Sequence, residues 1–149
     1  MRAIVQRSRH SRVVVDQVEK SHIDKGLMVL LGIKKGDRAS DADYLMDKII
    51  NLRIFEDEAG KMNRSLLEAG GSVLMVSQFT LYGDARKGRR PSFTNAEEPA
   101  RAEALFDYCV DWLRGQGLNV GTGVFGADML VAIENDGPVT ILLDSEKNF

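Results

Sequence analysis

The stretch SVLMVSQFTLY, residues 72–82, decides how the sequence is interpreted, because it is the longest apolar segment and ends in side chains that can do chemistry. Its β-branched and aromatic residues predict a strand over the whole segment. A second apolar run, GLMVLLGI at 26–33, lies between glycines and is long enough for one fully buried strand. The two runs therefore predict two strands, of which the one at 26–33 is fully buried.

Each of these two runs is followed along the chain by a segment with helical spacing. Ser40 precedes DADYLMDKIINL, and Asp43 lies three residues later, which predicts a weak capping box at the start of a helix. The inward stripe of this helix would be Leu45, Met46, Ile49 and Ile50. Pro99 opens a second predicted helix, which ends near residue 114 at a Gly-Gln-Gly signal.

The remaining segments predict further strands. RAIVQRS and SRVVVDQV read as two strands joined by a turn near Arg9 and His10, and RIFED as another. SLLEAGG predicts one helical turn. The last third predicts three strands, with a break at 126–128 and a sharp turn at 135–138. Runs of neighbouring strands with only two main helices favour an α+β fold, here one domain over residues 1–149.

Composition limits the possible partners. The chain has 149 residues, a net charge of −2 and one cysteine, Cys109, so it can form no internal disulfide. We expect Cys109 to be buried. A polyanion could be attracted only by a local patch, and the best candidate is the group Arg86, Lys87, Arg89 and Arg90. No stretch resembles a signal peptide or a membrane span, so we expect a cytoplasmic protein.

Familiar catalytic patterns are weakly supported. The only histidines, His10 and His22, lie in the N-terminal region and read as solvated surface residues, and no GxSxG motif is present. No metal-ligand spacing occurs, and we expect neither a metal nor a cofactor. GTGVFG at 121–126 reads as a strand bend, not a dinucleotide-binding turn.

Two polar stretches stay open on composition alone. RKGRRPSF, residues 86–93, is either a solvated loop or a loop that contacts phosphates. NDGPVT, residues 135–140, is at least a tight turn. Met75, Met129 and Phe125 fit a core as well as a pocket.

SQFTL at 77–81 and NDGPVT at 135–140 together resemble the paired motifs of the D-aminoacyl-tRNA deacylase family. MRAIVQR, KGLMVLLGI, DADYLMDKIINLRIFEDEAGKMN, RKGRRPSF and FGADM also follow the family pattern, so the resemblance is close to full-length. The main departures lie at residues 8–24.

This resemblance implies a large mixed, barrel-like sheet flanked by two main helices. It also implies a metal-independent ester hydrolase that cleaves D-aminoacyl-tRNA, and glycyl-tRNA as well, but rejects L-aminoacyl esters. The implied assembly is a homodimer with active sites at its interface. In each site the Gly137–Pro138 bond would be cis and would come from the partner subunit.

The resemblance also implies roles for single residues. The amides around Phe79 and Thr80 would stabilise the oxyanion, and we favour Thr80 as a residue that orients water or ribose over Thr80 as a nucleophile. Ser77 and Gln78 would shape the adenosine end of the pocket, and Met129 and Phe125 its wall. Arg7 would brace Gly137 and Pro138. Arg86, Lys87, Arg89 and Arg90 would receive phosphates. The alternatives are a non-catalytic RNA-binding module and an unrelated acyl hydrolase.

Overall fold

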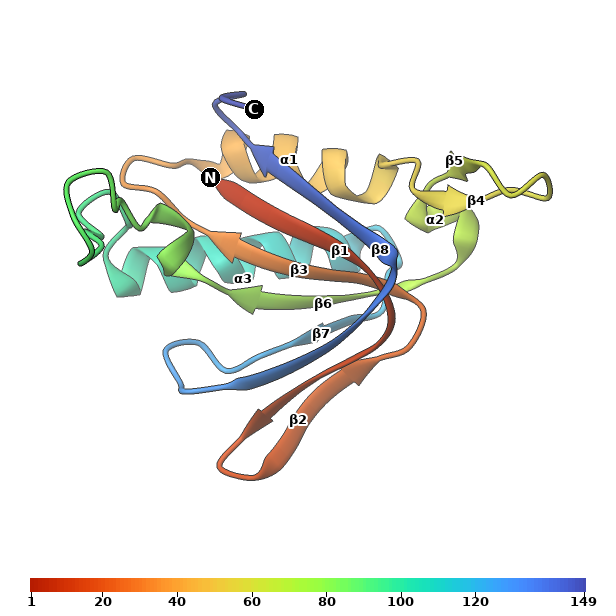
Figure 1. Ribbon diagram of the computed structural model, residues 1–149, viewed down its shortest axis with the longest axis horizontal. Helices are drawn as coiled ribbons and strands as arrows, with labels where there is room; N and C mark the ends of the chain where they lie inside the picture. The colour runs from red at the N-terminus through yellow and green to blue at the C-terminus, as the bar shows by residue number, and fades with distance from the viewer.

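A long bent strand, β1 (Arg2–Val15), organises the computed structural model, which describes residues 1–149 (Figure 1). It pairs with β8 (Leu130–Asp144) on one side, and on the other with β3 (Gly26–Gly32) and then β2 (Val18–Ile23), all antiparallel. Next to β3 follow β6 (Ser72–Ser77) and β7 (Val120–Thr122), both parallel to their neighbours. The sheet curls until the Ser21 hydroxyl on β2 donates to the Thr122 carbonyl on β7. The predicted barrel-like α+β fold is confirmed.

Two helices, α1 (Ala39–Asn51) and α3 (Pro99–Gly115), share the larger hydrophobic core with β1, β3 and β6. Figure 1 shows α3 behind β3 and β6. The predicted stripe of α1 is buried, as is Cys109 on α3. The shorter elements are β4 (Phe55–Glu56), β5 (Met62–Arg64), α2 (Leu66–Ala69) and the 3₁₀ helix η1 (Phe79–Tyr82). None of the helices has the length and apolar character that crossing a membrane requires.

The prediction of two N-terminal strands joined near Arg9 and His10 is wrong, because β1 is continuous. Its polar middle resembles a turn in sequence, yet Ser8 and Ser11 are buried and their hydroxyls lie 2.8 Å apart. Register shifts against β8 absorb this irregular segment. The real turn follows at Asp16–Gln17, where both residues have positive φ, and β2 after it was missed.

Other boundaries also differ from the predictions. The strand predicted over 72–82 ends at Ser77, and η1 takes its place. Helix α1 begins before Ser40, because Asp41 accepts a hydrogen bond from the Arg38 amide at 2.9 Å and caps the helix there. The short strand β5 was missed. The second helix and the single turn at α2 are confirmed.

The predicted turn at 135–138 lies inside one strand. Both arms of β8 pair with β1, with Gln6 opposite Thr140 and Ser8 opposite Asn135. The residues between these partners on β8 outnumber those on β1 and bulge out of the ladder. The predicted division into two strands is therefore wrong, although the chain does change direction there.

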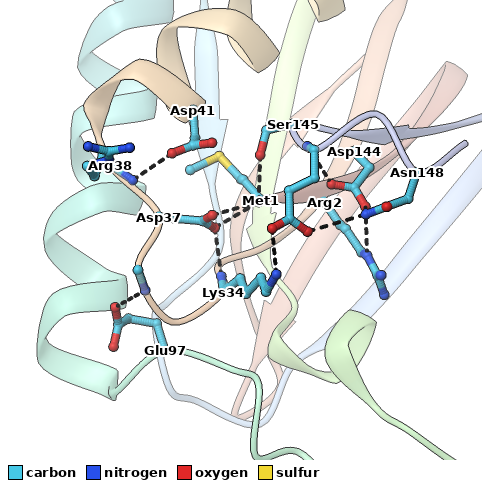
Figure 2. Close-up of polar contacts among 12 residues, drawn as sticks. Met1, Arg2, Lys34, Asp37, Arg38, Asp41, Glu97, Asp144, Ser145 and Asn148 are labelled. Atoms are coloured by element: carbon cyan, nitrogen blue, oxygen red, sulfur yellow. Dashed lines mark hydrogen bonds and ion pairs between the residues drawn. The ribbon is translucent and has the colours of Figure 1, made fainter.

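A buried polar cluster joins the start of β1 to the end of β8 (Figure 2). The amino group of Met1 lies 2.9 Å from the Asp37 carboxylate and 2.8 Å from the Ser145 hydroxyl. Next to it, Arg2 donates to Asp144 at 3.2 Å. Arg2 also donates to the Leu81 carbonyl at 3.3 Å, so the cluster reaches η1.

Candidate active site

A cleft of about 630 Å³ opens where β6 ends, between the start of α3 and the loop that precedes β8. It brings together five of the predicted site residues: Ser77, Gln78, Phe79, Phe125 and Met129. Met75, in contrast, is fully buried in the core. The end of β6 and the loop before β8 are about 50 residues apart in sequence, so the fold alone makes them neighbours.

Helix η1 packs closely against the end of β3 because Gly32 has no side chain there. A Cβ atom on Gly32 would lie only 3.0 Å from the Gln78 carbonyl oxygen and 3.0 Å from the Leu81 Cβ. The guanidinium of Arg2 lies over the Tyr82 ring, 4.7 Å from its centre. Tyr82 is buried while Phe79 and Thr80 remain exposed. The helix is thus fixed by its C-terminal half and presents its N-terminal half.

Thr80 lies beside the cleft but does not line it. Its hydroxyl accepts a hydrogen bond from the Gln78 amide group, and no histidine or carboxylate is bonded to it. The N–H groups of Phe79 and Thr80 lie in the first turn of η1, where a helix offers them no internal acceptor. The motif therefore presents main-chain donors, and Thr80 lacks an adjacent base.

The other classical nucleophile and bases are remote or occupied. Burial raises the pKa of the Cys109 thiol to about 12. His10 pairs with Asp24 and His22 with Glu19, and neither histidine lines the cleft.

Carboxylates outnumber cations in the cleft, a feature that sequence analysis missed. Glu97, Glu98 and Asp128 line it, together with one cation, Lys35. Glu97 is tied up by the amides of Glu98 at 2.9 Å and Gly36 at 3.3 Å, and the pKa of Glu97 is lowered mainly by the first of these bonds. Glu98 and Asp128 are exposed and make no ion pair. The cleft therefore favours a positively charged group.

The cationic segment forms a turn that we call the basic hairpin, residues 84–92, closed by a bridge between Asp84 and Ser92. Its base adjoins the cleft through Phe93, whose ring packs edge-on against Phe79 with 5.2 Å between centres. Arg86 is engaged by Asp84, with Nη2 2.6 Å from Oδ2. The other three cations of the group, Lys87, Arg89 and Arg90, are exposed and form no ion pair.

The Gly-Pro loop, residues 135–139, contains the bulge of β8, and its Gly137–Pro138 bond is cis. Buried Arg7 donates from Nε to the Asp136 carbonyl at 2.9 Å and from Nη1 to the Ile54 carbonyl at 2.7 Å. The Asn135 side chain, seen in sequence only as a turn former, accepts from the Val139 amide at 2.7 Å. The loop is held from both sides.

The Gly-Pro loop and the cleft lie at opposite ends of the sheet. Asn135 of the loop pairs with Ser8 on β1, and Ser8 pairs on its other side with Gly26 on β3. Gly26 in turn pairs with Ser72 at the start of β6, whereas the cleft lies at Ser77, the end of β6. Five strand residues separate these levels, which corresponds to roughly 17 Å. Within one chain, Gly137, Pro138 and Arg7 do not join the other predicted site residues.

Known proteins resemble this chain along its whole length. Residues 4–144 match the family model for D-Tyr-tRNA(Tyr) deacylase. D-aminoacyl-tRNA deacylases from Syntrophomonas wolfei subsp. wolfei and Clostridioides difficile are 68% and 58% identical over 149 residues, 100% of each chain. Among solved structures, the c-Myc DNA Unwinding Element Binding Protein gives a TM-score of 0.91 at 40% identity, covering 97% of this chain and 98% of that one. A probable eukaryotic D-amino acid tRNA deacylase shares the fold, with a TM-score of 0.76 at 21% identity over 95% and 97% of the chains.

Proposed function

The chain belongs to the D-Tyr-tRNA(Tyr) deacylase family, and we propose that it hydrolyses the ester bond of D-aminoacyl-tRNA in the cytoplasm, releasing tRNA and the D-amino acid. The observation that carries this proposal is the cleft itself. It joins the main-chain donors of η1, an excess of carboxylates and the base of a cationic hairpin. An aminoacyl ester on RNA has one group for each: a carbonyl, an ammonium and phosphates.

Hydrolysis needs the ester carbonyl beside η1. There the N–H groups of Phe79 and Thr80 stabilise the oxyanion that forms when water attacks. Thr80 orients the water or the terminal ribose, since neither a histidine nor a carboxylate is bonded to its hydroxyl to make it a nucleophile. The 2′-hydroxyl of the substrate helps to place the water. Neither step calls on a metal or a cofactor.

The other cleft residues hold the two ends of the ester. Ser77 and Gln78 contact the adenosine, and Met129 with Phe125 forms the opposite wall. The carboxylates of Glu98 and Asp128 attract the α-ammonium group of the amino acid.

A complete site requires two copies of the chain. Because the Gly-Pro loop lies roughly 17 Å from its own cleft along the sheet, it cannot act there. In a two-fold homodimer each loop reaches the cleft of the other copy, and both sites are completed at once. Each loop then offers main-chain carbonyls to the ammonium group.

This arrangement discriminates by handedness. With the ammonium and the carbonyl both held, the side chain of an L-residue is directed into the braced loop, whereas that of a D-residue points outward. Glycine has no side chain to reject, so glycyl-tRNA is cleaved too.

The basic hairpin supplies RNA affinity. The protein as a whole carries a charge of −2, so attraction to the acceptor stem is local. Lys87, Arg89 and Arg90 are free to contact phosphates.

The second candidate is a nucleic-acid-binding module without catalysis. It is favoured by the exposed cations and by the name of the 40% identical protein of known structure, which refers to binding of a DNA element. It predicts that binding ignores the aminoacyl group and that Gly137 is dispensable.

The first test compares deacylation of D-tyrosyl-tRNA and L-tyrosyl-tRNA by the wild type and by Thr80→Ala. We expect cleavage of the D-ester only, and substantial activity in the variant because Thr80 is not the nucleophile. If the wild type cleaves neither ester, the deacylase proposal fails and the binding module takes its place.

A second test addresses the shared site. Gly137→Ala disables the loop, and Met129→Arg fills the cleft, so each homodimer is inactive. Refolding a 1:1 mixture gives heterodimers in which one site combines an intact loop with an intact cleft, and about a quarter of wild-type activity returns. No recovery would mean that the loop does not act across an interface.

A further inference from the structure

The tip of the basic hairpin has almost no main-chain support. Asp84 and Ser92 exchange two backbone hydrogen bonds, of 2.8 and 2.9 Å, at its base. Beyond them, no backbone–backbone hydrogen bond of normal geometry joins two residues between 85 and 91. Gly88, with φ at +132°, turns the chain at the tip. Something other than the main chain must therefore define its shape.

The Asp84 carboxylate provides that support. Its Oδ1 accepts from the Arg86 amide at 3.0 Å and from Arg86 Nε at 2.9 Å, while Oδ2 accepts from Arg86 Nη2 at 2.6 Å. No other side chain makes a hydrogen bond to residues 85–91. One carboxylate thus fixes both the main chain and the guanidinium plane at the start of the tip.

The cations of the hairpin are therefore of two kinds. Arg86 has the edge of its guanidinium occupied by Asp84, and its charge is matched. Lys87, Arg89 and Arg90 have no partner in the protein.

We propose that Asp84 is a positioning residue for RNA binding, which locks Arg86 so that Lys87, Arg89 and Arg90 contact the phosphates and Arg86 does not. This inference rests on the proposed function, since that function supplies the tRNA. It assigns opposite roles to neighbouring arginines that the sequence presents as one cluster.

The direction of a single effect tests the idea. Asp84 is a negative charge beside a phosphate-binding segment, so by charge alone its removal strengthens RNA binding. The expected gain is about twofold for one charge at about 10 Å from a phosphate in water. If Asp84 holds the tip in shape, its removal weakens binding by about five- to tenfold, because the loop must then be ordered on binding. The two accounts predict opposite signs.

The experiment measures the dissociation constant of uncharged tRNA by fluorescence anisotropy for the wild type, Asp84→Ala and Asp84→Asn. We expect Asp84→Ala to bind more weakly, and Asp84→Asn to fall between, because its amide oxygen still accepts one bond from Arg86. Glu103→Gln is the matched control, since Glu103 is an exposed acid on α3 without a hydrogen bond to the hairpin. Binding by Asp84→Ala that is equal to or tighter than wild type overturns the proposal.

Salt dependence separates the two kinds of arginine. Arg89→Met removes a phosphate contact and lowers the slope of log K against log salt by about 0.7–0.9. Arg86→Met weakens binding but leaves this slope unchanged. The double variant Asp84→Ala/Arg86→Met binds no more weakly than Arg86→Met alone, since both substitutions break the same Asp84–Arg86 contact. A slope that falls as much in Arg86→Met as in Arg89→Met overturns the assignment.

Kinetics connect the inference to catalysis. Asp84→Ala raises KM for D-tyrosyl-tRNA and leaves kcat near the wild-type value, whereas partial misfolding would lower the apparent kcat and leave KM unchanged. If the wild type shows no deacylation at all, the proposed function fails, but the sign of the Asp84→Ala binding change still decides the role of Asp84.

Discussion

In the Gly-Pro loop and in the basic hairpin an aspartate lies beside an arginine, Arg7 of β1 at the loop and Arg86 within the hairpin, yet the two are supported in opposite ways. Arg7 is 8% exposed and donates to two main-chain carbonyls on different segments. The Arg86 side chain is 85% exposed and bonds to a residue two positions away. Interior arginine fixes the loop within the fold, whereas the hairpin is shaped locally at the surface. A site that checks handedness needs the first kind of support, and contacts with RNA phosphates tolerate the second.

The largest effect is expected from Gly137→Ala. Its φ of +143° disfavours any side chain, and an added Cβ would lie 2.8 Å from the Val139 side chain and 2.9 Å from its amide nitrogen. The loop must shift, and a displacement near 1 Å lowers kcat/KM for D-tyrosyl-tRNA by about 100-fold.

Gly60→Ala is the control for that variant, because Gly60 also has positive φ but open space around it. We expect full activity there. Equal activity in the two variants would show that loop shape is unimportant.

A smaller effect, on stability, separates the two arginines of the Gly-Pro region. Arg7→Met leaves the buried Ile54 carbonyl and the partly buried Asp136 carbonyl without their charged donor and lowers the free energy of unfolding by about 3 kcal/mol. Arg9→Met removes only an exposed contact to Asp136 and costs less than about 0.5 kcal/mol. Urea denaturation of the two variants measures the difference, and equal midpoints would contradict the bracing role of Arg7.

The smallest effect concerns pH. The side-chain hydrogen bonds from Arg86 lower the pKa of Asp84 to about 2. Because the folded-state pKa lies below the ordinary value of 3.8, the contribution of this carboxylate is complete above pH 3.8 and disappears only as the pH falls through about 2. Carboxyl NMR titration should give this midpoint in the wild type and a higher one in Arg86→Met. An unchanged midpoint in the variant would show that Arg86 does not hold the carboxylate.

Sequence patterns predicted those parts of the fold that depend on repeated burial. The stripe from Leu45 to Ile50 and the run at 26–33 both follow the spacing of the element they form. The prediction for the middle of β1 failed because two buried serine hydroxyls hydrogen-bond to each other, and neither residue alone indicates this pairing. The predicted start of α1 was wrong because the carboxylate of Asp41, and not the hydroxyl of Ser40, accepts the hydrogen bond from the Arg38 amide.

The site was predicted in pieces for the same reason. SQFTL and NDGPVT could be identified as motifs. That they lie at opposite ends of the sheet depends on strand register, which is defined only once β1 is paired with β3 and β8. The carboxylates of Glu98 and Asp128 lie in segments with no distinctive pattern. Lone polar residues on loops give no signal until the fold brings them to one cleft.

The bulge in β8 also bears on solubility. β8 pairs only with β1, so its other edge carries main-chain groups free to pair with a strand of another molecule. A strand of this length with an uninterrupted edge is a template for aggregation. Here residues 136–139 leave the ladder, and Pro138 has no N–H to offer, so the edge is divided into two short arms. The segment proposed to select substrates by handedness also interrupts the unpaired edge of the longest strand, where a strand of another molecule could otherwise pair along its whole length.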